Sequence, residues 1–233
     1  MELTDEVRNK NFEYVLDTHL WKTSDEYFAL AVLKFCYGER YQYLKKGEAP
    51  DLQDIENSIA IEVTNSILPN DAQIVGEFTK LQQVKTEKEK ERCREKIVTN
   101  SAQLEGDDFM IRGPRGSESE KEEFTIAFTQ KLNKLPQYRL KGFERIGLLI
   151  YHNRPLFCNT PNDFSGWLEK AQENRVDKYD FVHVLYLDGL LFYSFSTKEK
   201  NSIRISREDI YALWNLGRMT AEGEVKDDDP IWL

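Results

Sequence analysis

The chain has few of the residues that form disulfides and bind most transition metals. It contains three cysteines and three histidines among 233 residues. Cys36, Cys93 and Cys158 lie far apart and form no C-x-x-C pair, so the sequence predicts neither a zinc motif nor a disulfide framework. The histidines are equally scattered. We therefore expect reduced thiols, and histidines that serve in packing or at the surface.

Targeting signals and long apolar runs are also missing. The N-terminal stretch MELTDEVRNK lacks the pattern of a signal peptide, and no apolar run approaches the length that crosses a membrane. We expect a cytoplasmic protein that makes no contact with membranes. Hydrophobic side chains make up 40% of the chain and aromatic side chains 12%, which is enough to predict a folded core.

Positive charge is in short supply. Against 41 acidic residues there are 32 lysines and arginines, giving a formal net charge of −9. This charge favours solubility and repels polyanions, so a nucleic-acid partner would need a local basic patch. Arg112 and Arg115 are the strongest local basic pair. They lie within residues 105–122, where glycines, serines and a proline predict a loop or lid.

Nucleotide-binding and nucleophilic motifs are absent as well. The sequence has no G-x-x-x-x-G-K-[ST] and no G-x-G-x-x-G, and no Ser-His-Asp or Cys-His set stands out. What remains is a pair of acidic residues in a predicted hairpin, PDLQDIENSIAIEVT. There the turn-forming Glu56–Ser58 separate two short strands, Asp51–Ile55 and Ile59–Thr64.

Pairing of these two strands would place Asp51 beside Glu62 near one end of the sheet. Two carboxylates in a mostly apolar sheet repel each other unless positive charge stands between them, and either a divalent cation or a Lys or Arg can supply it. The alternative is an Asp next to a turn and an edge-strand Glu that face solvent. The apolar neighbours of Glu62 favour a central strand, and with it the metal site.

A long helix is predicted before the hairpin. Thr23–Glu26 matches the T-x-x-E capping box ahead of the apolar run YFALAVLKFCY. Because that run is apolar on both sides, the helix should be buried, with Gly38 as its stop. A strand at Glu39–Lys46 would follow it.

The remaining patterns complete a mixed fold. In chain order they predict a charged helical region at 71–99, the loop or lid at 105–122, a helix at Glu123–Tyr138, a buried strand at Ile146–Tyr151, a helix at 162–174, a hairpin at Phe181–Phe195 around Asp188-Gly189, a helix at Ser206–Leu216, and a frayed acidic tail at 222–233. The fold class is α/β (α+β), with a mixed central sheet flanked by helices in one domain, 1–233.

Pro50-Asp51, followed after a short gap by Glu62-Val63-Thr64 on a strand and preceded by a helix that carries Glu26, resembles the PD-(D/E)xK nuclease superfamily. The resemblance covers roughly residues 24–64, and the strand at 146–151 would continue the same sheet. It implies a restriction-endonuclease-like fold and Mg²⁺-dependent (or Mn²⁺-dependent) hydrolysis of phosphodiester bonds in DNA, with RNA as the alternative substrate.

The resemblance also assigns roles to residues. Asp51 and Glu62 match the two acids that bind Mg²⁺, and the backbone carbonyl of Val63 would be a third protein oxygen. This agrees with the preference of Mg²⁺ for a few hard oxygen ligands and several waters. Glu26 would assist the metal site through water, although it could instead complete the capping box of its helix.

Thr64 stands where the motif has a Lys. A Thr hydroxyl can hydrogen-bond a water but brings no positive charge. Lys80, Lys131 and Lys134 are candidates for a displaced lysine, and Lys131 is favoured because it falls on the apolar face of its helix, where its alternative is to snorkel to solvent. If none replaces the Lys, the chain is a catalytically inactive relative that acts as a protein- or nucleic-acid-interaction module.

Overall fold

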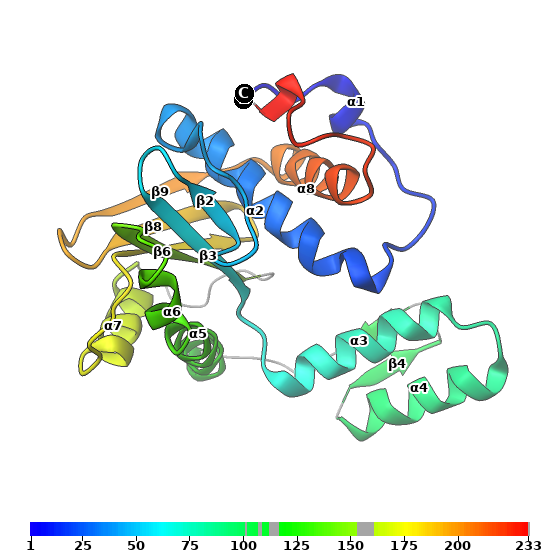
Figure 1. The fold of residues 1–233 in the computed structure, drawn as a ribbon. Coiled ribbons are helices and arrows are strands. Elements are labelled where there is room, and N and C mark those ends of the chain that lie inside the picture. Colours follow the sequence, from blue (N-terminus) through cyan, green and yellow to red (C-terminus); the bar gives the residue numbers. More distant parts are fainter. Residues whose placement is uncertain (101, 107–108, 112–116, 153–160, 233) are drawn as a thin grey trace.

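The computed structural model describes residues 1–232 except 101, 107–108, 112–116 and 153–160. Its centre is a seven-stranded sheet in the order β1-β2-β3-β6-β7-β8-β9 (Figure 1). The pairs β3–β6 and β6–β7 are parallel and the other pairs are antiparallel, so the predicted mixed α/β sheet is confirmed. The strands are β1 (Lys45–Lys46), β2 (Leu52–Asp54), β3 (Ile59–Asn65), β6 (Arg145–Tyr151), β7 (Phe181–Tyr186), β8 (Gly189–Ser194) and β9 (Lys200–Arg204).

Helices cover both faces of the sheet (Figure 1). One face carries α2 (Trp21–Tyr37) and α8 (Arg207–Ala221), and the other carries α5 (Ser117–Leu132), α6 (Leu135–Arg139) and α7 (Pro161–Gln172). Side chains of successive strand residues point to opposite faces. Ile61 and Leu149 therefore pack with α2 and α8, whereas Ala60 and Leu148 pack with α5 and α7. The sheet thus separates two hydrophobic cores.

A third, smaller core lies outside the sheet. It is built from α3 (Pro69–Gln83), α4 (Glu87–Thr99) and the two-stranded sheet of β4 (Gln103–Glu105) and β5 (Phe109–Ile111). Its buried residues are Ile74, Leu81, Cys93, Ile97 and Ala102. Figure 1 shows α3, α4 and β4 projecting away from the main sheet. This part of the chain links β3 to α5.

The start of α2 differs from the prediction. The helix begins at Trp21 after the short 3₁₀ turn η1 (Thr18–Leu20), and no side chain caps it. The Thr23–Glu26 capping box is therefore not used, because the helix already includes those residues. The predicted burial is confirmed, as is the stop at Gly38, which adopts the positive φ of 46° that favours glycine.

Three other predicted elements differ in extent. Most of Glu39–Lys46 forms the 3₁₀ helix η2 (Gly38–Tyr41) and a turn, so only Lys45–Lys46 are strand. The helical region 71–99 breaks at Val84, where α3 ends, and the predicted 123–138 helix breaks between α5 and α6. Strand β9 was not predicted because its side chains are mostly exposed and polar, without apolar alternation.

The predicted loop or lid at 105–122 is wrong in part. Strand β5 occupies residues 109–111, and α5 begins at Ser117. Arg112 and Arg115 lie outside the described residues, as does Cys158. Among the residues that are described, no helix is both long and apolar enough to cross a membrane.

The predicted fraying of residues 222–233 is also wrong. The tail forms the 3₁₀ turn η3 (Pro230–Trp232), and Trp232 is 3% exposed. Two contacts tie the tail to α2: the Tyr27 hydroxyl donates to Asp227 at 2.6 Å, and Lys34 Nζ donates to the carbonyl of Trp232 at 2.9 Å. The apolar residues at the end of the tail therefore pack on the protein although the tail has an acidic composition. The helix α1 (Asp5–Arg8) packs against α8 through the buried Val7.

Candidate functional site

Asp51 lies where strand β2 stops pairing with β3. The last ladder pair is Leu52 with Ile61, and one further step of the same register sets Asp51 opposite Glu62. The ladder ends there because Asp51 Oδ2, not a backbone carbonyl, accepts the hydrogen bond of the Val63 N–H at 2.9 Å. Asp51 and Glu62 are each 2% exposed. The hairpin therefore buries both acids at the edge of the sheet.

Lys131 reaches this edge from the α5 side. Its Nζ is 2.5 Å from Glu62 Oε1. The side chain of Lys131 is 16% exposed, and that of Glu62 is 3% exposed, so the pair is largely shielded from solvent. Tyr138 of α6 also lies near this carboxylate: burial raises the pKa of Tyr138, and the negative charge of Glu62 raises it further.

Helix α2 contributes a third acid, Glu26, and a second amine, Lys22. Lys22 Nζ lies 3.0 Å from Glu26 Oε1 and 3.3 Å from Asp51 Oδ1, so it bridges the two carboxylates. Lys46 of β1 approaches Glu26 Oε2 at 2.9 Å. Glu26 is 3% exposed. It therefore belongs to the acidic cluster and not to a helix cap.

Burial and nearby charges together shift the pKa values of Glu26 and Asp51 in opposite directions. Burial raises the pKa of Glu26, and the hydrogen bonds from Lys46 and Lys22 offset this only in part. Burial acts in the same direction on Asp51, but the Val63 N–H and the positive charge of Lys131 outweigh it and lower its pKa below the ordinary value. Asp51 is thus the acid that stays ionised, and Glu26 takes up a proton first.

Thr64 lies two residues beyond Glu62 on the same face of β3, where it is half-buried beside Ile150 of β6. The two other lysine candidates are exposed: Lys80 on α3 and Lys134 at the N-cap of α6. Of the three candidates, Lys131 is the one that contacts the acidic pair.

The oxygen atoms at this edge are donors of the kind that Mg²⁺ prefers. Glu62 Oε2 is buried without a hydrogen-bond partner. The N–H and C=O of one strand residue point to the same side, so the Val63 carbonyl faces Asp51 as its N–H does. Two carboxylates and a carbonyl are hard donors that leave room for water. Within the described parts of the chain, no group of three or more His, Cys, Asp or Glu residues is arranged to hold a metal; the set named here has two such residues.

Sequence reasoning missed three residues of the site: Lys22, Lys46 and Tyr138. One signal was present, because Lys22 precedes Glu26 by four residues and such pairs meet on one helix face. Lys46 reaches the acids through the pairing of β1 with β2, and Tyr138 reaches them through the packing of α6. No spacing in the sequence points to them.

A second buried polar cluster holds the start of α5 against the sheet. Ser66 Oγ lies 2.6 Å from His152 Nδ1, and Glu120 Oε1 lies 3.5 Å from His152 Nε2. Glu123 approaches the same ring at 4.0 Å, and Phe124 stacks on it at 5.0 Å between centroids. The cluster sits at the carboxyl ends of β3 and β6 and positions the helix that carries Lys131.

No protein-family model, curated protein or solved structure matches the chain. The geometry of the acidic site therefore carries the functional argument.

Proposed function

We propose that the protein is a Mg²⁺-dependent (or Mn²⁺-dependent) nuclease that hydrolyses phosphodiester bonds of DNA, and that it has a restriction-endonuclease-like fold. The observation that carries the proposal is the amine of Lys131, 2.5 Å from Glu62. The Lys131 amine, on α5, would supply the positive charge that the motif Lys supplies and that Thr64 on β3 does not. The chain order of α2, β1, β2 and β3, with β6 next to β3 in the sheet, also agrees with the resemblance.

Asp51, Glu62 and the carbonyl of Val63 would hold the metal. When bound, the ion would supply an acidified water and a counter-charge for the phosphoryl group. The low pKa of Asp51 keeps this carboxylate ionised and ready to bind a cation. Glu26, whose pKa is raised, would hold a proton more readily and would act through water.

Lys131 would orient the attacking water and stabilise negative charge on the phosphoryl oxygens. Its position beside Glu62, inside a largely buried site, keeps the amine fixed instead of solvated, and fixed charges in a dry site stabilise developing charge best. Lys22, whose side chain is 72% exposed, would meet the backbone of an incoming strand. These amines offset the negative charge of the buried acids, which limits the repulsion of DNA at this site in a protein whose net charge is −9.

Cleavage of plasmid and single-stranded DNA in Mg²⁺ or Mn²⁺ tests the proposal. Asp51→Ala, Glu62→Ala and Lys131→Ala should each lower the cleavage rate by about 100-fold or more, since each removes a group that acts on the reacting phosphate. Lys134→Ala is the matched control, because this lysine is exposed two residues after α5 ends, and it should cleave like wild type. Equal rates for Lys131→Ala and Lys134→Ala, or no cleavage by wild type on any substrate, would count against the proposal.

The second candidate is a catalytically inactive relative that serves in interactions. The observation in its favour is that the three buried acids are matched by three lysine amines, so the cluster is neutral without any ion. It predicts that Mn²⁺ leaves the melting temperature unchanged. A rise in melting temperature with Mn²⁺ that disappears in Glu62→Gln would exclude it, because only binding to the native state stabilises in this way.

A further inference from the structure

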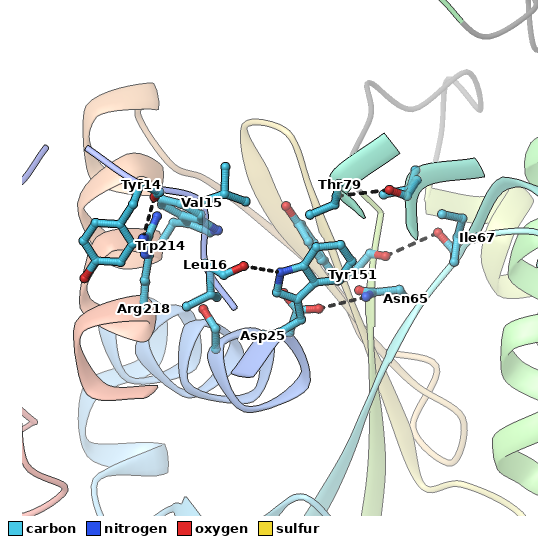
Figure 2. Close-up of a pocket in the computed structure, with 14 residues that line it drawn as sticks. Tyr14, Val15, Leu16, Asp25, Asn65, Ile67, Thr79, Tyr151, Trp214 and Arg218 are labelled. Carbon is cyan, nitrogen blue, oxygen red and sulfur yellow. Dashed lines mark hydrogen bonds between the residues drawn. The ribbon is translucent and has the colours of Figure 1, made fainter. Parts of the chain in front are cut away.

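A cavity of about 600 Å³ opens between α2 and the end of β3, two elements that also carry residues of the acidic site (Figure 2). Its walls come from residues 14–16, the first turns of α2, the end of β3, α3 and α8. Figure 2 shows Tyr14, Leu16 and Arg218 along one side and Asn65, Ile67 and Thr79 along the other. The cavity thus lies where residues 14–16, the main sheet and helix α3 meet.

The cavity and the acidic site share two elements. On α2, Asp25 lines the cavity and the next residue, Glu26, belongs to the site. On β3, Asn65 lines the cavity on the same face as Val63, whose N–H binds Asp51, and it lies two residues further on, about 7 Å along a strand. That separation is close to the span from the phosphate to the base of one nucleotide. A group bound at the carboxylates would therefore have the cavity within reach.

Aromatic rings form much of the cavity wall. Trp21, Tyr151 and Trp214 line it and are half-buried. The Trp21 indole is held in place because its Nε1 donates to the carbonyl of Leu16 at 3.1 Å. Fixed rings with an uncovered face stack on nucleobases of any sequence.

The polar groups of the cavity suit the edge of a base. Asn65 Nδ2 donates to Asp25 Oδ2 at 2.9 Å, which fixes the amide plane (Figure 2). An amide has two donor hydrogens and an acceptor oxygen, so one N–H and the carbonyl of Asn65 can still pair with a base. Asn side chains recognise adenine through this donor and acceptor pair.

We propose that this cavity accepts one unstacked base of the nucleic-acid strand whose phosphate lies at Asp51 and Glu62. The proposal rests on the nuclease function proposed above. Taking a base out of a duplex costs a few kcal/mol, and the cost is least for a base that is already unpaired. The preferred substrate is therefore single-stranded or locally unpaired DNA.

Binding of two small probes tests the base site apart from cleavage. Quenching of tryptophan fluorescence in Mg²⁺ measures the affinity for dAMP and for deoxyribose 5-phosphate, which lacks the base. One stacked base corresponds to about tenfold or more in affinity, so wild type should prefer dAMP by at least that factor. Thr79→Phe, which fills the cavity from a half-buried position on α3, and Asn65→Leu should each remove most of this preference.

Glu62→Gln separates the two proposals. It should weaken both probes equally and leave the preference for dAMP intact, because it alters only the phosphate end of the site. If wild type cleaves no substrate yet prefers dAMP in a manner that Thr79→Phe abolishes, the nuclease proposal fails and the base site stands. Equal affinity for both probes, or an unchanged preference in Thr79→Phe with native circular dichroism, overturns the base site.

Cleavage of one sequence as a single strand and as a duplex then identifies the source of the base. Wild type should cut the single strand about tenfold faster than the duplex. Thr79→Phe should reduce this ratio of cleavage rates. If dAMP binds in the cavity but both forms are cut at equal rates, the cavity binds a free nucleotide and its assignment to the strand is overturned.

Discussion

Lys131 and Glu62 form an ion pair that solvent barely reaches, so each depends on the other more than a surface pair would. Removing the amine leaves a carboxylate that is 3% exposed without its nearest counter-charge. We expect Lys131→Met to lower the free energy of unfolding by about 2–3 kcal/mol. Urea titration followed by circular dichroism measures this.

The matched change Lys134→Met should stay within about 0.5 kcal/mol of wild type because this lysine is exposed. Lys131→Arg keeps the charge but replaces a compact amine with a planar fork. It should retain most of the stability while losing cleavage activity. Equal stability of the Lys131→Met and Lys134→Met variants would show that the Lys131–Glu62 ion pair is not shielded from solvent as described.

Asp25 makes stability depend on pH in a defined window. Burial raises its pKa to about 6 from an ordinary 3.8, against the hydrogen bond from Asn65, and the negative charge of Glu26 raises it further. The folded state therefore binds more protons than the unfolded state between these two values, so stability falls as pH rises from about 4 to about 6.

Asp25→Asn should remove this dependence. The amide oxygen can still accept from Asn65, so the variant should be more stable than wild type by about 1–2 kcal/mol near pH 7. The advantage should nearly vanish near pH 3.5, where Asp25 is mostly protonated in both states. Thermal melts at the two pH values measure it, and an advantage of the same size at both would refute the assignment.

At the scale of elements, α5 is fixed at both ends. Its first turns meet His152 through Glu120 and Glu123, and its last turn meets β3 through Lys131 and Glu62. A shift at the first end would move the amine at the second. The helix works as a rigid connection between a buried polar cluster and the acidic site.

His152→Phe tests this connection. The new ring can keep the stack on Phe124, while the polar contacts to Ser66 and Glu120 are lost. We expect a loss of about 2–4 kcal/mol in the free energy of unfolding and a drop in kcat that exceeds any change in KM. A variant with reduced stability but an unchanged kcat would mean that α5 holds its position without the cluster.

Some elements follow from local pattern and others do not. Alternating Ile59 and Ile61 predict β3 and its register because a one-residue slip would put Glu62 in the other core. The capping box at Thr23–Glu26 predicts the wrong start for α2, because the helix already begins at Trp21 and includes the box. Packing therefore overrides a short capping motif at the end of a helix more readily than it overrides a periodic apolar pattern.

At the scale of the whole molecule, local pattern alone predicts only the meeting of the two acids that one hairpin contains. Asp51 and Glu62 are 11 residues apart and meet through a tight turn. Lys131 is 69 residues from Glu62, beyond the α3–α4 part of the chain. The apolar face of its helix favours Lys131 over the other lysines, but sequence pattern does not predict which distant helix packs on the sheet beside Glu62.

The acidic site spans both layers of the protein, with Lys22 and Glu26 in one and Lys131 in the other. During synthesis α2 and β3 emerge early, Lys131 follows much later, and α2 gains its main partner, α8, only near the end. An unfinished chain therefore holds Lys22 and Lys46 beside Glu26 and Asp51, but it lacks Lys131 beside Glu62 and the packing of α8 on α2. If the protein is the nuclease proposed above, its site would be complete only when nearly the whole chain has been made and folded, and a nascent chain would not cut nucleic acid near the ribosome.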